Sequence, residues 1–314
     1  MAFRSTGPLL SALRSGIARN RNGSRRNFPI LPLVTGVTIS GSLVGYAILK
    51  DRDWTTPLKE QFTLHADSAP SDFRDDPKSK AAFRVDSDTN IQFPLDLSSS
   101  LVTPSPNLSL VGLGVRKVSF LRVKVYSAGF YLDEAATKDL KNVEGWHTFT
   151  AQHLLTPPTK APSDPLNAPQ LSGEELMKNL FDRPVAIAVR IVPNRNTDFG
   201  HLRDAFTRAL QARQRLARTK GELTLEDEQR ITESIQILKS FFPAQTVLKG
   251  KQVVLLRPRE GGLIVEFEGK ILGQLNDPWI GKQLMLTYFA DKETVSEKLK
   301  EDVAKGLEEI INQK

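Results

Sequence analysis

The first fifty residues constrain this chain most, because they join a basic leader to an uncharged apolar segment. Residues 1–27 contain six arginines and no acidic residue, with small apolar side chains between them, which is typical of a mitochondrial transit peptide. Residues 28–49 are 22 consecutive positions without a charge, about the length that crosses roughly 30 Å of hydrocarbon. We therefore expect a transit peptide, one transmembrane helix and a domain tethered behind it.

The orientation of this predicted span follows from the charges around it. The arginines precede it, and basic flanks favour the matrix side, so we expect an inner-membrane protein whose domain faces the intermembrane space. Small residues recur within the span at Gly36, Ser40, Gly41 and Gly45. Such residues let two membrane helices approach closely, and a homo-oligomer formed through the span is one interpretation.

The charge and the composition of the chain exclude several classes of function. Of the 43 Lys and Arg residues, seven lie within 1–50, which leaves 36 against 36 Asp and Glu in the remainder. The net charge of +7 therefore belongs to the leader, and no nucleic-acid partner is expected. The chain has no cysteine, and it contains no HExxH motif, so no metal site is predicted.

The rest of the chain divides into a linker and one domain. Residues 50–89 are rich in Asp, Ser, Pro and Lys and are predicted to be a linker, whereas periodic patterns fill 90–314. Short apolar or alternating runs predict strands at 108–115, 118–132, 148–155, 184–192, 246–257, 262–268 and 271–275. Helical spacing predicts helices at 172–182, 196–217, 224–241, 276–290 and 293–313, and five prolines make 156–171 a surface loop. This order indicates an α+β fold.

One glycine-rich segment needs to be distinguished from a nucleotide loop. Leu110–Arg116 reads Leu-Val-Gly-Leu-Gly-Val-Arg, but Lys117 stands where a dinucleotide loop has its third glycine. The following residues predict a strand, and a dinucleotide loop requires a helix there to hold the pyrophosphate. We therefore do not expect this segment to bind a nucleotide.

The same segment carries a family resemblance. Ile91–Pro94, Leu110–Arg116 and Val123–Leu132 resemble the opening strands of the chalcone isomerase family. Val192–Phe206 resembles the fungal mitochondrial branch of that family, the altered-inheritance-of-mitochondria proteins. The resemblance covers about residues 90–314, and it implies an open-faced β-sandwich in which helices cover one face of a large antiparallel sheet above an apolar cleft.

The resemblance assigns a role to Arg116. In the plant enzymes, the matching arginine holds a phenolate and stabilises an enolate while a flavanone ring closes. A guanidinium can do this inside an apolar cleft because it stays charged and donates from a fixed fork. We therefore name Arg116 and Tyr126 as the candidate catalytic pair.

Several positions depart from the plant pattern. Tyr126 replaces a threonine, and Phe199 and Phe206 stand where the plant cleft has a tyrosine and an asparagine. Arg190 corresponds to the plant lysine of the next strand, and the substrate-contacting threonine near the C-terminus falls at Thr287 or Tyr288. Because most of the polar network is lost, flavonoid cyclisation itself is not expected.

The spacing of polar residues along the first strands adds Lys124 to the candidate site. Arg116, Lys124 and Tyr126 are separated by even numbers, so an unbroken strand would place them on one face. The apolar alternation changes parity at Phe120-Leu121, where a bulge or tight turn would reset that face. The predicted ligand-binding set is Arg116, Lys124, Tyr126, Arg190, Phe199, Phe206 and Tyr288.

Three functions remain open from the sequence. The first is binding of an apolar acidic ligand, a fatty acid or haem; haem is not required, and the sequence does not select an axial histidine. The second is an intramolecular lyase or isomerase that acts on an unknown substrate. The third is a non-catalytic scaffold at the inner membrane.

Overall fold

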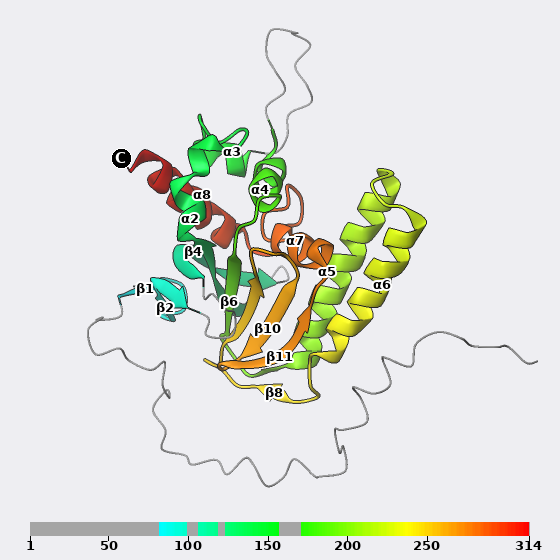
Figure 1. Cartoon of the computed structure of the whole chain (residues 1–314). Helices are drawn as coiled ribbons and strands as arrows, with labels where there is room; N and C mark the ends of the chain where they lie inside the picture. The colour runs from blue at the N-terminus through cyan, green and yellow to red at the C-terminus, as the bar shows by residue number, and fades with distance from the viewer. Residues whose placement is uncertain (1–81, 99–105, 119–122, 157–170, 314) are drawn as a thin grey trace, which may run out of the picture. The chain divides into compact units, whose positions relative to one another are not determined.

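The computed structural model describes residues 82–98, 106–118, 123–156 and 171–313 (Figure 1). The predicted transit peptide, the predicted span at 28–49, most of the linker and most of the proline-rich loop lie outside these residues. Among the helices that the structure does describe, none has the length and apolar character needed to cross a membrane.

The core of the domain is an antiparallel sheet. Its order is β11-β10-β9-β6-β5-β4-β3, and every neighbouring pair is antiparallel. The strands are β3 (Asp96–Ser98), β4 (Asn107–Val118), β5 (Val123–Asp133), β6 (Ile187–Pro193), β9 (Val253–Arg257), β10 (Leu263–Phe267) and β11 (Lys270–Leu275). The α+β class and the large antiparallel sheet predicted from the sequence are therefore confirmed.

Two small sheets flank this core. β1 (Phe83–Val85) pairs with β2 (Gln92–Pro94), and β7 (Thr197–Asp198) pairs with β8 (Thr246–Val247). β1 lies within the segment predicted as linker, so the end of that segment is a strand. The run predicted at 246–257 divides into β8 and β9, because the chain turns between them.

The helical elements of the described residues include the five that the periodicity predicts and three short ones that it does not predict. They are α2 (Glu134–Lys138), the 3₁₀ turn η2 (Leu140–Asn142), α3 (Ala151–Leu155), α4 (Gly173–Phe181), α5 (Phe199–Thr219), α6 (Leu225–Ser240), α7 (Pro278–Leu286) and α8 (Glu297–Asn312). The strand predicted at 148–155 is wrong, because α3 occupies its second half. Thr150 and His153 form a capping box that starts a helix there.

The helices cover one face of the sheet. Alternate strand residues such as Phe130, Val189 and Leu255 join the helices in the main apolar cluster. The residues between them, such as Tyr131, Ala188 and Val254, form a second cluster on the other face. This alternation is the one expected of strands with two different faces.

Two glycines of β4 bring α8 directly onto the sheet. A Cβ atom at Gly112 would lie 2.5 Å from the Val303 backbone nitrogen, and one at Gly114 would lie 2.4 Å from that of Leu299. Gly306 of α8 permits the same close approach from the helix side, because a Cβ atom at this position would lie 2.0 Å from the Val111 carbonyl oxygen. The glycines that resemble a nucleotide loop in the sequence are therefore contacts between a strand and a helix.

Candidate functional site

Arg116 and Tyr126 lie opposite each other on neighbouring strands. They are register partners of β4 and β5, and the Arg116 guanidinium carbon lies 5.9 Å from the centre of the Tyr126 ring. Arg116 is half-buried, and its Nη1 donates a hydrogen bond of 3.2 Å to the carbonyl of Val295. The pair therefore places a cation over a buried phenol.

Tyr288 completes this group from the other end of the chain. It follows α7 and is fully buried, and its hydroxyl has no hydrogen-bond partner among the described residues. Thr294 donates to the Tyr288 carbonyl at 2.8 Å, and the Val295 amide donates to the Thr287 carbonyl at 3.2 Å. The segment that holds Tyr288 therefore also supplies the carbonyl that orients Arg116.

The burial of the two phenols keeps them protonated. Burial raises the pKa of Tyr126, and the charge of Arg116 offsets only part of that rise. Burial also raises the pKa of Tyr288 well above its usual value, and the neighbouring Tyr126 phenol raises it further. Both side chains are therefore neutral hydrogen-bond donors at any physiological pH.

The charge of Arg116 is not neutralised by an ion pair with any described carboxylate. No ion pair joins Arg116 to an Asp or Glu of the described residues, although other arginines of the domain make such pairs. Arg116, Tyr126 and Tyr288 thus combine a positive charge with two neutral phenols at the edge of the main apolar cluster. We call these three residues the Arg116 cluster. It has the chemistry to accept an anionic oxygen.

Phe199 and Phe206 of α5 belong to the same apolar cluster, but their aromatic neighbours lie on β10 and directly after α6. The ring of Phe199 lies 5.0 Å from that of Phe267, and the ring of Phe206 lies 5.9 Å from that of Phe242. Both side chains are buried. Their contacts are those of core aromatic residues, which the sequence did not separate from a ligand-binding role.

The structure separates Arg190 from the Arg116 cluster. Arg190 alternates with Val189 and Ile191, which face the helices, so it lies on the other face of the sheet. It donates to the Gln252 side chain at 2.5 Å and to the Gln92 carbonyl at 3.0 Å, and its guanidinium lies 5.0 Å from the Phe93 ring. These contacts tie β2 to the sheet.

Lys124 also lies apart from Tyr126. Its ammonium lies 3.6 Å from a carboxylate oxygen of Asp88, which Lys117 also contacts at 3.2 Å. The adjoining turn hydrogen-bonds to Ser127 through Thr89, on the face of β5 opposite Tyr126. The expected single face for Arg116, Lys124 and Tyr126 does not hold for Lys124, because the β4–β5 register shifts next to Arg116.

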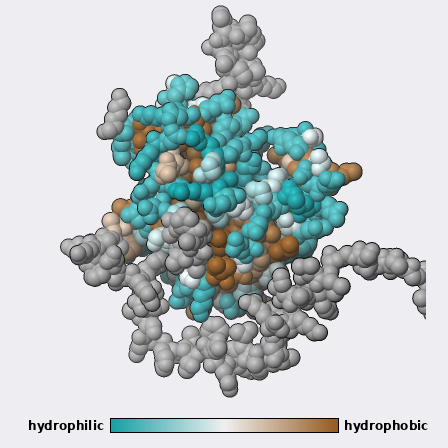
Figure 2. Space-filling view, in the orientation of Figure 1, coloured by the Kyte–Doolittle hydropathy of each residue, from teal (hydrophilic) through white to brown (hydrophobic). Residues whose placement is uncertain are grey.

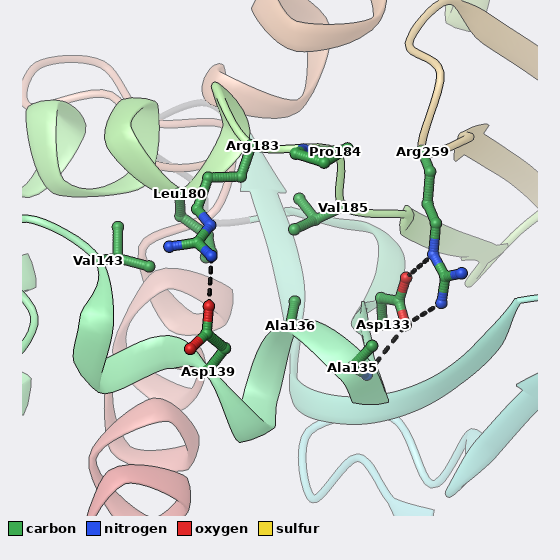
Figure 3. Close-up of a pocket in the computed structure, with 10 residues that line it drawn as sticks. All are labelled: Asp133, Ala135, Ala136, Asp139, Val143, Leu180, Arg183, Pro184, Val185 and Arg259. Atoms are coloured by element: carbon green, nitrogen blue, oxygen red, sulfur yellow. Dashed lines mark hydrogen bonds and ion pairs between the residues drawn. The ribbon is translucent and has the colours of Figure 1, made fainter.

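A pocket of about 320 Å³ lies at the opposite end of the sheet (Figure 3). Arg259 forms a bidentate pair with Asp133, and Arg183 pairs with Asp139. Ala135, Ala136, Val143, Leu180, Pro184 and Val185 supply the apolar lining. None of the residues predicted for the site lines this pocket.

The aspartates at this pocket have structural roles that explain their pairing. Asp133 caps α2 by accepting from the Ala135 amide at 3.0 Å, and its carboxylate is almost fully buried. Burial alone would raise the pKa of Asp133, but the hydrogen bonds from Arg259 and Ala135 lower it overall. Aspartate is a preferred N-cap residue, but the spacing of apolar residues predicts no helix directly after Asp133, so this signal went unrecognised.

The histidines of the described residues lie away from the Arg116 cluster. His201 is largely exposed and lies 2.8 Å from Asp198, and His153 accepts a hydrogen bond from the Thr150 amide at 3.0 Å. His147 is exposed. In the part of the chain that the structure describes, no group of three His, Asp or Glu residues could hold a metal ion.

Comparisons with known proteins agree on the family of this domain. A family model described as "Chalcone isomerase like" matches residues 106–304. The protein from Debaryomyces hansenii called "Altered inheritance of mitochondria protein 18, mitochondrial" is 30% identical over 68% of this chain and 71% of its own length. The protein of that name from Eremothecium gossypii is 27% identical over 82% of both chains.

One solved structure extends this comparison to the fold. The crystal structure of a fatty-acid binding protein from Arabidopsis thaliana superposes with a TM-score of 0.52 at 17% identity, and the match covers 73% of this chain and 99% of that one. The similarity concerns the arrangement of the sheet and helices.

Proposed function

Because the chain belongs to the chalcone isomerase-like family, we propose that its domain binds a small apolar ligand with a carboxylate, such as a fatty acid. In this proposal Arg116, Tyr126 and Tyr288 hold the carboxylate. One observation carries it: a half-buried arginine without a carboxylate partner in the described structure lies beside buried phenols, one of which has no hydrogen-bond partner.

The energetics of these groups favour an anionic ligand. A buried hydroxyl without a partner costs about 1–3 kcal/mol, and a hydrogen bond to a charged group contributes about 1.5–3 kcal/mol. A carboxylate would satisfy the Tyr288 hydroxyl and the free donors of Arg116 together. The Arabidopsis thaliana structure with the similar fold is that of a fatty-acid binding protein, which supports the same class of ligand.

Haem fits the described residues less well than a fatty acid. Arg116 suits a propionate, but iron also needs an axial ligand, for which histidine is the usual choice. The histidines at 147, 153 and 201 are exposed or engaged in capping and pairing at the surface. Haem, when bound, supplies redox or gas-binding chemistry, and no step of this proposal passes through it.

The test is a fatty-acid affinity measurement on the full-length delipidated protein. Displacement of a fluorescent fatty acid should show binding, and Arg116→Ala should weaken it about tenfold to a hundredfold, as expected for the loss of a charged hydrogen bond. Arg183→Ala is the matched control, because it removes an arginine that already has a carboxylate partner. Equal affinity in all three proteins would remove Arg116 from the site, and no uptake at all would reject the function.

A haem titration of the same protein separates the two ligands. We expect no shift of the Soret band, since the described histidines do not converge on the Arg116 cluster. A shifted band that Arg116→Ala abolishes would replace the fatty acid with haem in this proposal.

An isomerase or intramolecular lyase is the second candidate. Arg116 and the two neutral phenols could also stabilise an enolate, because preorganised donors act on developing negative charge. Phe199 and Phe206 offer no polar group for a flavonoid, so we expect a blank chalcone assay. Turnover above background that vanishes in Arg116→Ala would place the enzyme first, while a scaffold role would leave both assays blank.

The names of the fungal relatives support a mitochondrial location. We place the protein in the inner membrane, with the domain in the intermembrane space, on the predicted leader and span. Protease treatment after selective rupture of the outer membrane should digest the domain. Complete protection under these conditions would contradict the orientation.

A further inference from the structure

One end of the sheet gathers loops from four parts of the chain. The Asn194 amide donates to the Val125 carbonyl at 3.0 Å, and the Lys249 amide donates to the Asn196 side chain at 2.9 Å. The Glu268 amide donates to the Gln252 carbonyl at 3.2 Å. These bonds place the end of β4 and the start of β5, the loop after β6, the loop before β9 and the β10–β11 turn at one edge of the sheet.

This edge carries an excess of positive charge. Its exposed basic side chains are Lys117, Lys124, Arg195, Lys249, Lys251 and Lys270. The carboxylates around them are fewer, namely Asp88 of the β1–β2 turn, Asp198 and Glu268. Asp88 pairs with Lys117 and Lys124, and Glu268 pairs with Lys251, so the excess comes mainly from Arg195, Lys249 and Lys270. We call this edge the basic end. Its excess is local, because residues 51–314 as a whole are neutral.

Apolar side chains are exposed among these charges. Val118 is 38% exposed, Leu248 is 49% exposed and Ile271 is 45% exposed. Figure 2 shows apolar surface over β10 and β11, next to hydrophilic surface at the end where β8 lies in Figure 1. Exposed aliphatic side chains between lysines are typical of surfaces that lie in a membrane interface.

We propose that the basic end docks on the surface of an anionic lipid bilayer. Lysines and arginines near such a surface are attracted by its negative potential, and the apolar side chains at positions 118, 248 and 271 enter the headgroup region. A neutral domain with one basic edge binds a bilayer in one orientation. The charge is complementary to anionic headgroups, and the exposed apolar side chains among the lysines favour a bilayer, which has an apolar interior, over a nucleic acid.

The Arg116 cluster adjoins the basic end. Arg116 precedes Lys117 of the basic end directly, and Tyr126 pairs with Pro193, next to the loop that carries Arg195. A ligand with an apolar tail and a carboxylate is an amphiphile that bilayers dissolve. The docked orientation brings the Arg116 cluster toward the bilayer, although the docking does not depend on which ligand is bound.

The predicted anchor is compatible with this contact. The predicted span ends at residue 49 and the described structure begins at residue 82. The intervening 33 steps of the chain span about 110–120 Å at most when fully extended, so the predicted anchor permits the basic end to meet the same membrane.

Because the chain has no cysteine, a single introduced cysteine can report on docking. Full-length protein with Leu248→Cys, labelled with an environment-sensitive fluorophore, is reconstituted into phosphatidylcholine vesicles with or without an equal part of phosphatidylglycerol. We expect acrylamide quenching of the label to fall about threefold in the anionic vesicles. About 1 M salt should reverse this, because it shortens the Debye length to about 3 Å. Glu260→Cys, at the opposite end of the sheet, should show no change.

Charge reversal tests the electrostatic part of the proposal. Lys249→Glu with Lys270→Glu should abolish the protection of the label, whereas Lys138→Glu with Lys141→Glu, at the opposite end, should preserve it. Circular dichroism checks that each variant is folded. If a double variant does not fold, the variant with only one of its two charge reversals is measured instead. Equal quenching in both types of vesicle, protection at position 260 as well, or protection that survives the reversal would overturn the proposal. A retained fatty-acid affinity together with lost docking would show that the two functions are separate.

Discussion

At one end of the sheet Arg116 lies half-buried beside two buried phenols, and no carboxylate of the described residues pairs with it, whereas at the other end Arg183 and Arg259 each pair with an aspartate. The paired arginines hold α2, the chain before β6 and the turn after β9 together (Figure 3). Their charge is already neutralised within the protein. Because Arg190 and Arg257 also lack a carboxylate partner among the described residues but donate to two acceptors each, a missing carboxylate is informative only together with the unpaired buried phenol of Tyr288, and we propose the ligand site on that combination.

The largest expected effect concerns the strand that carries Arg116. Gly114→Ala would bring a Cβ atom to 2.4 Å from the backbone of Leu299, so α8 must move away from β4. We expect a loss of about 3 kcal/mol in the free energy of unfolding, measured by urea denaturation. Val118→Ala, on an exposed position of the same strand, should change it by less than about 0.5 kcal/mol. Equal stability of the two variants would show that α8 does not need the glycine contact.

The comparison between the two ends of the sheet predicts different losses of stability when their arginines are replaced. Arg259→Ala leaves the buried Asp133 carboxylate without its bidentate partner, and we expect it to lower the free energy of unfolding by about 2 kcal/mol. Arg116→Ala removes no ion pair of the described residues, only the hydrogen bond to the Val295 carbonyl and the contact with the Tyr126 ring, and should lower it by about 1 kcal/mol at most. Thermal and urea denaturation of both variants would check this. A large loss in Arg116→Ala would mean that Arg116 is structural too.

The paired end should also respond to acid. The pKa of Asp133 is lowered in the folded protein from its usual 3.8, because hydrogen bonds from Arg259 and Ala135 outweigh the effect of burial. A lowered pKa contributes stability at neutral pH, and this contribution is lost as the pH falls through the folded-state pKa. Asp133→Asn should therefore cost about 1 kcal/mol at neutral pH, and the difference from the parent should shrink below pH 3.8. A difference that stays constant with pH would assign the effect to packing.

The smallest expected effect has the opposite sign. Tyr288→Phe removes a buried hydroxyl that has no partner among the described residues, so it should raise the free energy of unfolding by about 1 kcal/mol. The same variant should bind a fatty acid more weakly, because it loses a donor to the carboxylate. Denaturation and fluorescent fatty-acid displacement on one preparation measure both. A variant that is less stable and binds normally would mean that the hydroxyl serves the fold.

Much of the fold follows from local patterns in the sequence. The helical spacing of apolar residues predicts α4, α5 and α6 within a few residues. The alternation along β4 and β5 predicts strands, and the parity change at Phe120-Leu121 falls between Val118 and Val123, which pair with each other. The strand predicted at 148–155 is wrong because a capping box outweighs a short apolar run.

The candidate site was only partly predictable. Arg116 and Tyr126 were named from a family resemblance, and Tyr288 was one of two alternatives with Thr287. Lys124 and Arg190 could not be separated from them, because a register shift and the opposite face of the sheet decide where those side chains lie. The paired arginines 183 and 259 could not be recognised, since each meets an aspartate distant in sequence.

The sequence by itself determined the α+β class and the residue types available at each position, and it predicts a leader and a span that lie outside the described residues, because these features depend on composition and on spacing within one segment. The tertiary structure alone decided which arginine meets a carboxylate and which does not. Pairing across the sheet joins residues as far apart as Arg116 and Val295, and it also gathers the lysines of four separate loops at the basic end. Local periodicity carries no information about such contacts, because they depend on strand register and on the close approach of α8 that the β4 glycines permit.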